Sequence, residues 1–178
     1  MKIEEFSYHL PQSFIAQAPL PHRDRSRMLV LKAATGLVRH RIFRDIPEYL
    51  REGDVLVVND SRVLPARLVG RKESGAVIEI LLLSKIPAEG EGELWEAMLK
   101  PAKRVRVGTV IQLPGTGRAE VEERPSEKKW RLRFFSPEPF AAYLNHHGRA
   151  PLPPYIKRTQ EDDRSAGDRD RYQTIYAR

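Results

Sequence analysis

The spacing of apolar and turn-forming residues predicts a small α/β region at the start of the chain. Residues 27–32 are strand-like, residues 34–36 (Ala-Thr-Gly) form a turn, and residues 37–43 alternate apolar and basic side chains. Together they predict a β-hairpin. Residues 44–51 have the pattern of a helix. The continuous apolar run at residues 55–58 predicts a strand buried on both faces, as in an α/β sheet.

The rhythm of the pattern changes after residue 62. Six short β-prone runs follow, separated by glycine-rich and proline-rich turns, with no helical pattern between them. They occupy residues 65–72, 76–84, 94–100, 108–113, 118–123 and 129–135. Short strands at this spacing indicate a small β-barrel or a sandwich.

The segment after the sixth run returns to helical and extended patterns. Ser136-Pro137-Glu138 is typical of a helix start with Ser136 as the N-cap, and Gly148 is typical of its end. The last segment, from Pro151 onward, is extended and charged, and residues 172–176 could form a strand. The pattern therefore indicates an α/β piece, an all-β insert and a return to the α/β piece, with too few elements to complete a covered sheet.

The composition excludes several classes of protein. The chain has 178 residues, a net charge of +7 and no cysteine, which excludes disulfide scaffolds and cysteine zinc sites. Its first residues do not have the pattern of a signal peptide, and its longest apolar runs are far shorter than a membrane span. We therefore expect a soluble, cytoplasmic protein without a membrane partner.

The positive charge is clustered, which favours a polyanionic partner. Residues 22–44 contain seven basic side chains and one acid, residues 61–72 contain four basic side chains and no acid, and residues 100–106 form a third basic group. Clustered cations neutralise phosphates and release counterions. The alternative is a solvated surface on which long basic side chains cover apolar area.

Polar residues directly after the run at 55–58 are the first candidates for chemistry. Asn59-Asp60-Ser61-Arg62 would lie beyond the carboxyl end of a strand, where open α/β sheets bind ligands. The alternative is a simple turn, because Asn, Asp and Ser bond to their own backbone. The adjacent histidines His146 and His147 lack a third ligand at metal spacing, so we expect no metal site.

Several longer strings resemble one family when they are taken in order. They are residues 6–11 with 15–17 (Phe-Ser-Tyr-His-Leu-Pro and Ile-Ala-Gln), 23–27 (Arg-Asp-Arg-Ser-Arg), 53–54 with 59–68 (Gly-Asp and Asn-Asp-Ser-Arg-Val-Leu-Pro-Ala-Arg-Leu), 99–103 (Leu-Lys-Pro-Ala-Lys), 148–158 (Gly-Arg-Ala-Pro-Leu-Pro-Pro-Tyr-Ile-Lys-Arg) and 170–174 (Asp-Arg-Tyr-Gln-Thr). The family is S-adenosylmethionine:tRNA ribosyltransferase-isomerase, of queuosine biosynthesis. Its members are about twice as long, so the chain resembles an amino-terminal half.

The resemblance implies a fold and a division into domains. The fold it implies is an incomplete α/β domain with an inserted all-β six-stranded barrel. We place the α/β domain at residues 1–62 and 145–178 and the inserted barrel at residues 63–144. The expected partner of this chain is the missing carboxy-terminal half, and the full-length enzyme is expected to be a monomer.

The resemblance also implies the reaction and its partners. The ribosyl part of S-adenosylmethionine passes to aminomethyl-deazaguanine in the wobble position of tRNA, giving epoxyqueuosine and releasing adenine and methionine. S-adenosylmethionine is thus a substrate, the anticodon stem-loop of tRNA is the partner, and no metal is implied.

The residues that match these strings supply the candidates for each role. Asp60 is the candidate catalytic or substrate-orienting carboxylate. Candidate substrate-binding residues are Asn59, Arg62, Tyr155, Tyr172 and Gln173, and the two tyrosines could stack on a base. Candidate tRNA-binding residues are Arg23, Arg25, Arg27, Arg67, Lys100, Lys103, Arg104, Lys157 and Arg158.

Two other interpretations remain open from the sequence. The first is a non-catalytic RNA-binding module in which only the barrel and its basic rim act. The second is a misassembled fragment without activity, whose exposed apolar surface is covered by self-association.

Overall fold

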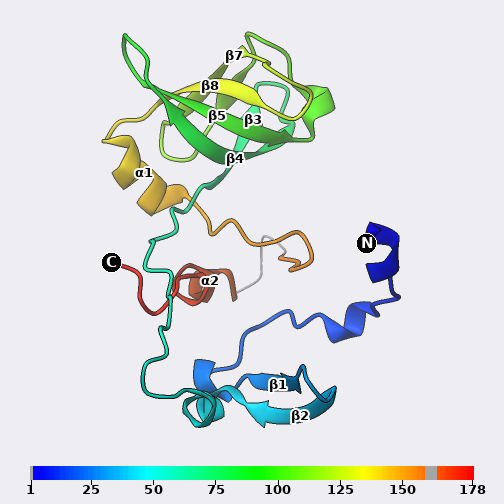
Figure 1. The fold of residues 1–178 in the computed structure, drawn as a ribbon. Coiled ribbons are helices and arrows are strands. Elements are labelled where there is room, and N and C mark those ends of the chain that lie inside the picture. The colour runs from blue at the N-terminus through cyan, green and yellow to red at the C-terminus, as the bar shows by residue number, and fades with distance from the viewer. Residues whose placement is uncertain (1, 159–163) are drawn as a thin grey trace.

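Six strands of the described residues close into an antiparallel β-barrel, in the order β3-β4-β5-β8-β7-β6 (Figure 1). The computed structural model describes residues 2–158 and 164–178. The strands are β3 Arg67–Lys72, β4 Val77–Ile86, β5 Glu93–Lys100, β6 Val110–Gln112, β7 Arg118–Glu123 and β8 Trp130–Phe135. The predicted six-stranded barrel is therefore confirmed, and of the two all-β alternatives the barrel is correct.

Apolar side chains at every second position of the strands point inward and form the core of the barrel. On β4, Ile78 and Ile80 are fully buried, whereas Glu79 between them lies on the outer face. On β8, Trp130, Leu132 and Phe134 are buried at intervals of two residues. Because a six-stranded barrel is too narrow for a lumen, these inward side chains fill it completely and supply most of the apolar burial.

Helix α1, Phe140–His147, packs against the barrel with its apolar side. Phe140, Tyr143 and Leu144 are buried, and the Phe140 ring lies 4.9 Å from the ring of Phe134. Gly148 follows as the C-cap residue, which confirms the predicted end of the helix.

The predicted N-cap at Ser136 is wrong, because the helix begins after Pro139. The Ser136 hydroxyl instead donates to the Glu138 carbonyl at 2.6 Å. Glu138 precedes a proline, and a residue in that position is disfavoured in the helical region. The helix therefore begins at Phe140, directly after Pro139.

Tyr143 links α1 to the barrel through a buried hydrogen bond. Its hydroxyl donates to the Pro114 carbonyl at 2.5 Å, and burial, aided by the negative charge of Glu138, raises the pKa of Tyr143 to about 12. Tyr143→Phe should lower the free energy of unfolding by about 1 kcal/mol, because the hydrogen bond between the hydroxyl and this carbonyl is lost. Urea denaturation of this variant and of Tyr155→Phe, a change at an exposed tyrosine, measures the difference.

The raised pKa gives this stabilisation a defined pH range. An unfolded tyrosine ionises near pH 10, whereas the folded one stays neutral to about pH 12. The contribution is complete below pH 10 and is lost as pH rises through 12. The stability difference between the wild-type chain and Tyr143→Phe should therefore shrink across that range, and a difference that stays constant to pH 12 would contradict this role of the hydroxyl.

The predicted hairpin is confirmed as β1 Arg27–Lys32 paired with β2 Leu37–Ile42 in a two-stranded antiparallel sheet. The helix predicted at residues 44–51 is a 3-10 helix, η4 Phe43–Tyr49, and Pro47, which cannot donate a backbone hydrogen bond, lies inside it. The remaining helices among the described residues are η1 Ile3–Phe6, η2 Gln12–Phe14, η3 Arg23–Arg25, η5 Ala102–Arg104 and α2 Arg164–Tyr172.

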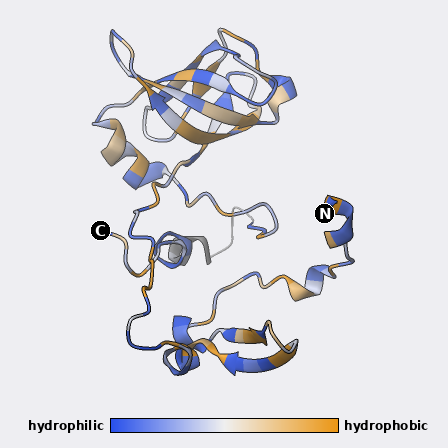
Figure 2. Ribbon diagram, in the orientation of Figure 1, coloured by the Kyte–Doolittle hydropathy of each residue, from blue (hydrophilic) through white to orange (hydrophobic). Residues whose placement is uncertain are grey.

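The strand predicted at residues 55–58 is absent, which corrects the sequence-based expectation. These residues have no regular secondary structure, and Val55 and Val57 are 86% and 89% exposed. Within residues 2–158 and 164–178, no strand pairs with them, and an apolar run cannot form a buried strand without partners. Figure 2 shows apolar residues along this extended tract between the hairpin and the barrel.

The strand considered for residues 172–176 is also absent. Tyr172 ends helix α2, and the chain then forms a turn. The Gln173 side chain forms two hydrogen bonds with the backbone of Val63. None of the described helices has the length and apolar character needed to cross a membrane.

Candidate functional site

Gln173 joins the end of α2 to the segment that follows the candidate Asn59–Arg62 motif. Its side-chain oxygen accepts from the Val63 amide at 2.8 Å, and its side-chain nitrogen donates to the Val63 carbonyl at 2.7 Å. Arg23 then donates to the carbonyls of Gln173 and Asp170 at 2.7 and 2.9 Å. Three segments that are far apart in the sequence therefore meet at Gln173, through its side chain and its backbone carbonyl.

A second group of contacts holds Arg158 against α2 and the amino-terminal segment. The guanidinium donates to both carboxylate oxygens of Asp168, at 2.7 and 2.9 Å, and to the Gln17 carbonyl at 2.9 Å. The side chains of Arg158 and Asp168 are only 13% and 10% exposed. A bidentate ion pair at this burial is stronger than a surface pair, and removing one partner leaves a poorly solvated charge.

Gln17 extends the same group of contacts. Its amide donates to the Tyr155 carbonyl at 3.0 Å and accepts from the Lys157 amide at 2.8 Å. The proline-rich segment that carries Tyr155 is thereby fixed along the amino-terminal segment.

A hollow of about 130 Å³ lies beside the Gln173 contacts. It brings together three of the predicted substrate-binding residues, Arg62, Tyr172 and Gln173. The other lining residues are Val63, Leu64, Pro65, Asn145, Ala150, Pro151, Arg169 and Asp170. Its polar groups include two guanidinium groups, a carboxylate, a phenol and two amides, which suit a polar, charged ligand.

Asn59, Asp60 and Tyr155 do not line this hollow. The Asn59 side chain accepts from the Ser61 amide at 2.9 Å, which is the turn chemistry that the sequence offered as an alternative. The Asp60 carbonyl accepts from the Arg178 amide at 3.1 Å, and its carboxylate lies on the exposed surface. Tyr155 is 52% exposed. Among the described residues, no group of three or more potential ligands is arranged to hold a metal ion.

The candidate tRNA-binding cations fall into two groups. Three of them are engaged within the chain: Arg23 and Arg158, as described, and Arg67, which pairs with Glu79 at 2.7 Å and donates to the Leu152 carbonyl at 3.0 Å. The exposed ones are Arg25, Arg27, Lys100, Lys103, Arg104 and Lys157. Figure 1 shows the hairpin that begins at Arg27 and the barrel that carries Lys100 at opposite ends of the molecule. The described residues therefore do not gather these cations on one surface.

Sequence reasoning missed the structural importance of Gln17 and Asp168. The alternating charges of residues 168–173 predict an ion-paired, exposed loop. Asp168 is indeed paired with Arg158, but it is only 8% exposed and lies in helix α2. The partners of Gln17 lie about 140 residues away along the chain, as at Tyr155 and Lys157, so no short-range pattern could reveal them.

Gln173→Ala should break the connection to Val63. Alanine can neither accept from the Val63 amide nor donate to its carbonyl, so we expect a loss of about 1–3 kcal/mol in local stability. Hydrogen exchange at the Val63 amide measures this loss, with Gln112→Ala on the exposed face of β6 as the matched control. Unchanged protection of Val63 in the Gln173→Ala variant would show that the contact is not stabilising.

Known proteins are similar to this sequence along its whole length. Relatives from Syntrophus aciditrophicus, Staphylococcus saprophyticus and Pelobacter propionicus, each named S-adenosylmethionine:tRNA ribosyltransferase-isomerase, are 51%, 45% and 44% identical over 100% of this chain. The matches cover 54%, 50% and 50% of those relatives, so the chain spans about half their length. A crystal structure of S-adenosylmethionine tRNA ribosyltransferase from Thermotoga maritima is 39% identical over 85% of this chain and 52% of its own, with a TM-score of 0.38.

A family model gives the assignment directly. The model described as queuosine biosynthesis protein matches residues 3–178, which is nearly the whole chain. This chain therefore belongs to the queuosine biosynthesis protein family.

Proposed function

We propose that this chain forms part of an enzyme that transfers and isomerises the ribosyl part of S-adenosylmethionine onto aminomethyl-deazaguanine in the tRNA wobble position. The products are epoxyqueuosine in tRNA, adenine and methionine. One observation carries the proposal: 51% identity over the whole chain to a relative named for this transfer and isomerisation.

Asp60 is the proposed proton acceptor. The sulfonium of S-adenosylmethionine acidifies the C–H bonds of the ribosyl methylene beside it, and a carboxylate at that position would take the proton. Asn59 and Arg62 are close to Asp60 in the sequence and would orient the substrate, while Tyr172 and Gln173 would hold it from the end of α2. Tyr155 would stack on a base.

The size of the hollow supports a requirement for more polypeptide. Pockets that enclose a ligand of the size of S-adenosylmethionine commonly measure about 300–1,000 Å³. The hollow beside Gln173 measures about 130 Å³. We infer that the second half of the family's polypeptide completes the substrate pocket, and that this chain alone is inactive.

The exposed apolar residues also support the second half of the family's polypeptide as the partner of this chain. Val55, Leu56 and Val57 are between 63% and 89% exposed, and Leu29 and Leu31 of β1 are 60% and 58% exposed. Apolar surface of this extent is unfavourable in water and is commonly covered by another protein surface. We further propose that the chain divides into an α/β domain at residues 1–62 and 145–178 and an inserted barrel at residues 63–144.

Two forms of labelled S-adenosylmethionine test the reaction. The protein to use is this chain joined to the second half of the Syntrophus aciditrophicus relative, called the joined enzyme below. Label in the ribose should enter tRNA and adenine should be released, whereas label in the methyl group should not enter tRNA. Transfer of the methyl label would identify a methyltransferase instead, and absence of both labels from tRNA would contradict the proposal.

A non-catalytic RNA-binding barrel remains the second candidate. It is favoured by the exposed, basic loop at Lys100, Lys103 and Arg104 on a closed barrel. This candidate predicts that the joined enzyme binds tRNA but incorporates neither label.

A further inference from the structure

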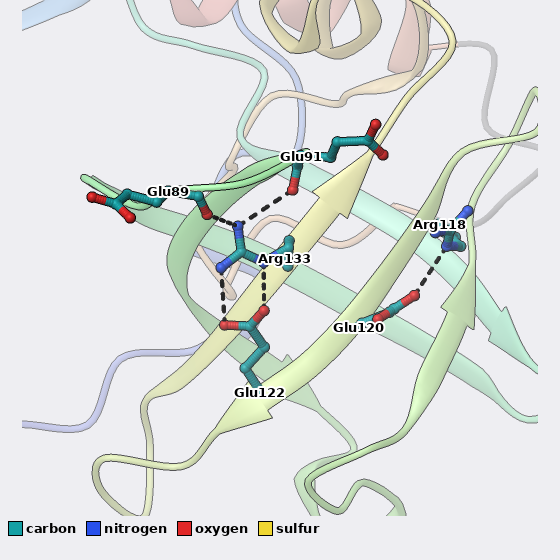
Figure 3. A network of polar contacts seen from close by, with 6 residues as sticks. All are labelled: Glu89, Glu91, Arg118, Glu120, Glu122 and Arg133. Atoms are coloured by element: carbon teal, nitrogen blue, oxygen red, sulfur yellow. Dashed lines mark hydrogen bonds and ion pairs between the residues drawn. The ribbon is translucent and has the colours of Figure 1, made fainter.

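The cations on much of the outer surface of the barrel are neutralised by carboxylates. Figure 3 shows Arg133 held by Glu122 and by the carbonyls of Glu89 and Glu91, with Arg118 bound to Glu120 at 3.0 Å. Further ion pairs on the barrel are Arg67 with Glu79, Lys85 with Glu93, Lys129 with Glu96 and Arg131 with Glu123. This part of the barrel therefore presents little net charge to a polyanion.

A different arrangement occurs where β3, β6 and η5 meet. We call this region the basic end and define it by Arg71, Lys72, Lys103, Arg104 and Arg106. Within residues 2–158 and 164–178, none of the five forms an ion pair. Their charge is therefore available to an external ligand.

The backbone fixes the direction of these side chains. Val105 is 5% exposed and Ala102 packs against the same core, so Lys103, Arg104 and Arg106 lie on the exposed side of the loop. The Lys72 ammonium donates to the Arg104 carbonyl at 2.8 Å, which joins β3 to η5. A ligand would thus meet a charge cluster whose backbone is already ordered, and little entropy would be lost on binding.

An open hollow of about 660 Å³ lies beside this cluster. Lys72, Ser74, Thr109 and Gln112 line it with an ammonium, two hydroxyls and an amide, and Glu73 contributes one carboxylate. The remaining lining residues are Gly108 and Val110. None of these residues lines the hollow beside Gln173, so the two regions are separate.

We propose that the basic end binds the phosphate backbone of a tRNA stem, away from the base that is modified. This inference rests on the proposed function for the identity of the RNA. Contacts of this kind position a nucleic acid without reading its sequence, and they are salt-dependent because each neutralised phosphate releases counterions. The basic end would orient the tRNA while the substrate pocket holds the wobble base.

The test compares two triple variants of the 178-residue chain that remove the same charge. The first is Lys103→Ala with Arg104→Ala and Arg106→Ala. The matched control is Lys85→Ala with Lys129→Ala and Arg131→Ala, which removes three cations that are paired in the structure. Fluorescence anisotropy with tRNA at several salt concentrations gives the affinity and its salt slope, and thermal unfolding checks that both variants are folded.

The basic-end variant should bind tRNA about 10-fold or more weakly at low salt, with a salt slope reduced by about 2–3. The control variant should keep both values close to those of the wild-type chain. Equal losses in the two variants would mean that only net charge matters and would overturn the proposal, as would unchanged binding by the basic-end variant.

The same substitutions in the joined enzyme separate this inference from the proposed function. The basic-end variant should raise KM for tRNA and leave kcat unchanged, because the residues touch RNA away from the reacting atoms. Ribose transfer with unchanged KM would refute the basic end alone. Absence of ribose transfer from the joined enzyme before any substitution would refute the proposed function.

Discussion

Asp60→Asn in the joined enzyme should lower kcat by about 10²–10⁴, the range that a general base contributes. The substitution keeps the size of the side chain and removes its capacity to take a proton from the ribosyl methylene. The affinity for tRNA should be unchanged, because Asp60 is not among the candidate cations. Single-turnover transfer of ribose label into tRNA measures the chemical step, and anisotropy measures the affinity.

Asp54→Asn provides the matched control for this prediction. Asp54 lies in the same exposed segment, and its carboxylate accepts from the Arg51 amide at 2.7 Å. Its substitution should leave the rate of ribose transfer within a factor of a few of the wild-type rate. If Asp60→Asn shows turnover as high as the control, Asp60 has no part in the chemistry.

Val57→Asp should prevent productive association with the second half of the enzyme and abolish the activity that this half restores. In the chain alone Val57 is 89% exposed, so the substitution should change the free energy of unfolding by no more than about 0.5 kcal/mol. In the assembled enzyme the same carboxylate would be buried among apolar residues without a partner, which is strongly unfavourable. Analytical ultracentrifugation of the mixed halves measures association, and ribose transfer measures activity.

Val57→Ile is the control, because it keeps a β-branched apolar side chain at the same position. It should associate and react like the wild-type chain. Activity that persists in the Val57→Asp mixture would show that residues 55–58 remain exposed in the complete enzyme. It would contradict the proposal that the second half covers these residues.

The barrel was predictable because its structure is encoded by local patterns. The predicted run at residues 118–123 coincides with β7, and the runs on either side match β6 and β8 to within two residues. Alternation such as Trp130, Leu132 and Phe134 identifies the inward face of a strand without knowledge of its neighbours. Whether six strands form a barrel or a sandwich depends on how the first strand pairs with the others, and here β3 closes against β6.

The prediction of a strand at residues 55–58 was wrong because it depended on a partner strand and not on a local pattern alone. An apolar run indicates that burial is favourable, but burial also requires a neighbouring strand. In the described residues, the preceding strands β1 and β2 pair only with each other, and the next strand, β3, pairs with β4 and β6. The apolar pattern thus indicates that residues 55–58 favour burial, but the described residues provide no partner strand for them.

The candidate site was only partly predictable from the sequence. Arg62, Tyr172 and Gln173 line one hollow, as expected for residues of one site. The contacts that hold Arg23 and Arg158 inside the chain arise from pairs separated by long stretches of sequence, such as Arg23 with Gln173. A basic residue that binds an internal carbonyl and one that binds a phosphate have the same sequence signature, so only the three-dimensional structure distinguishes them.

Mass spectrometry of tRNA that carries aminomethyl-deazaguanine tests the central claim most directly. The tRNA is incubated with S-adenosylmethionine and either this chain, the second half of the Syntrophus aciditrophicus relative, or both as separate polypeptides. We predict that the mass of epoxyqueuosine appears only with both polypeptides. Epoxyqueuosine formed by this chain alone, or none formed by two halves that associate, would contradict it.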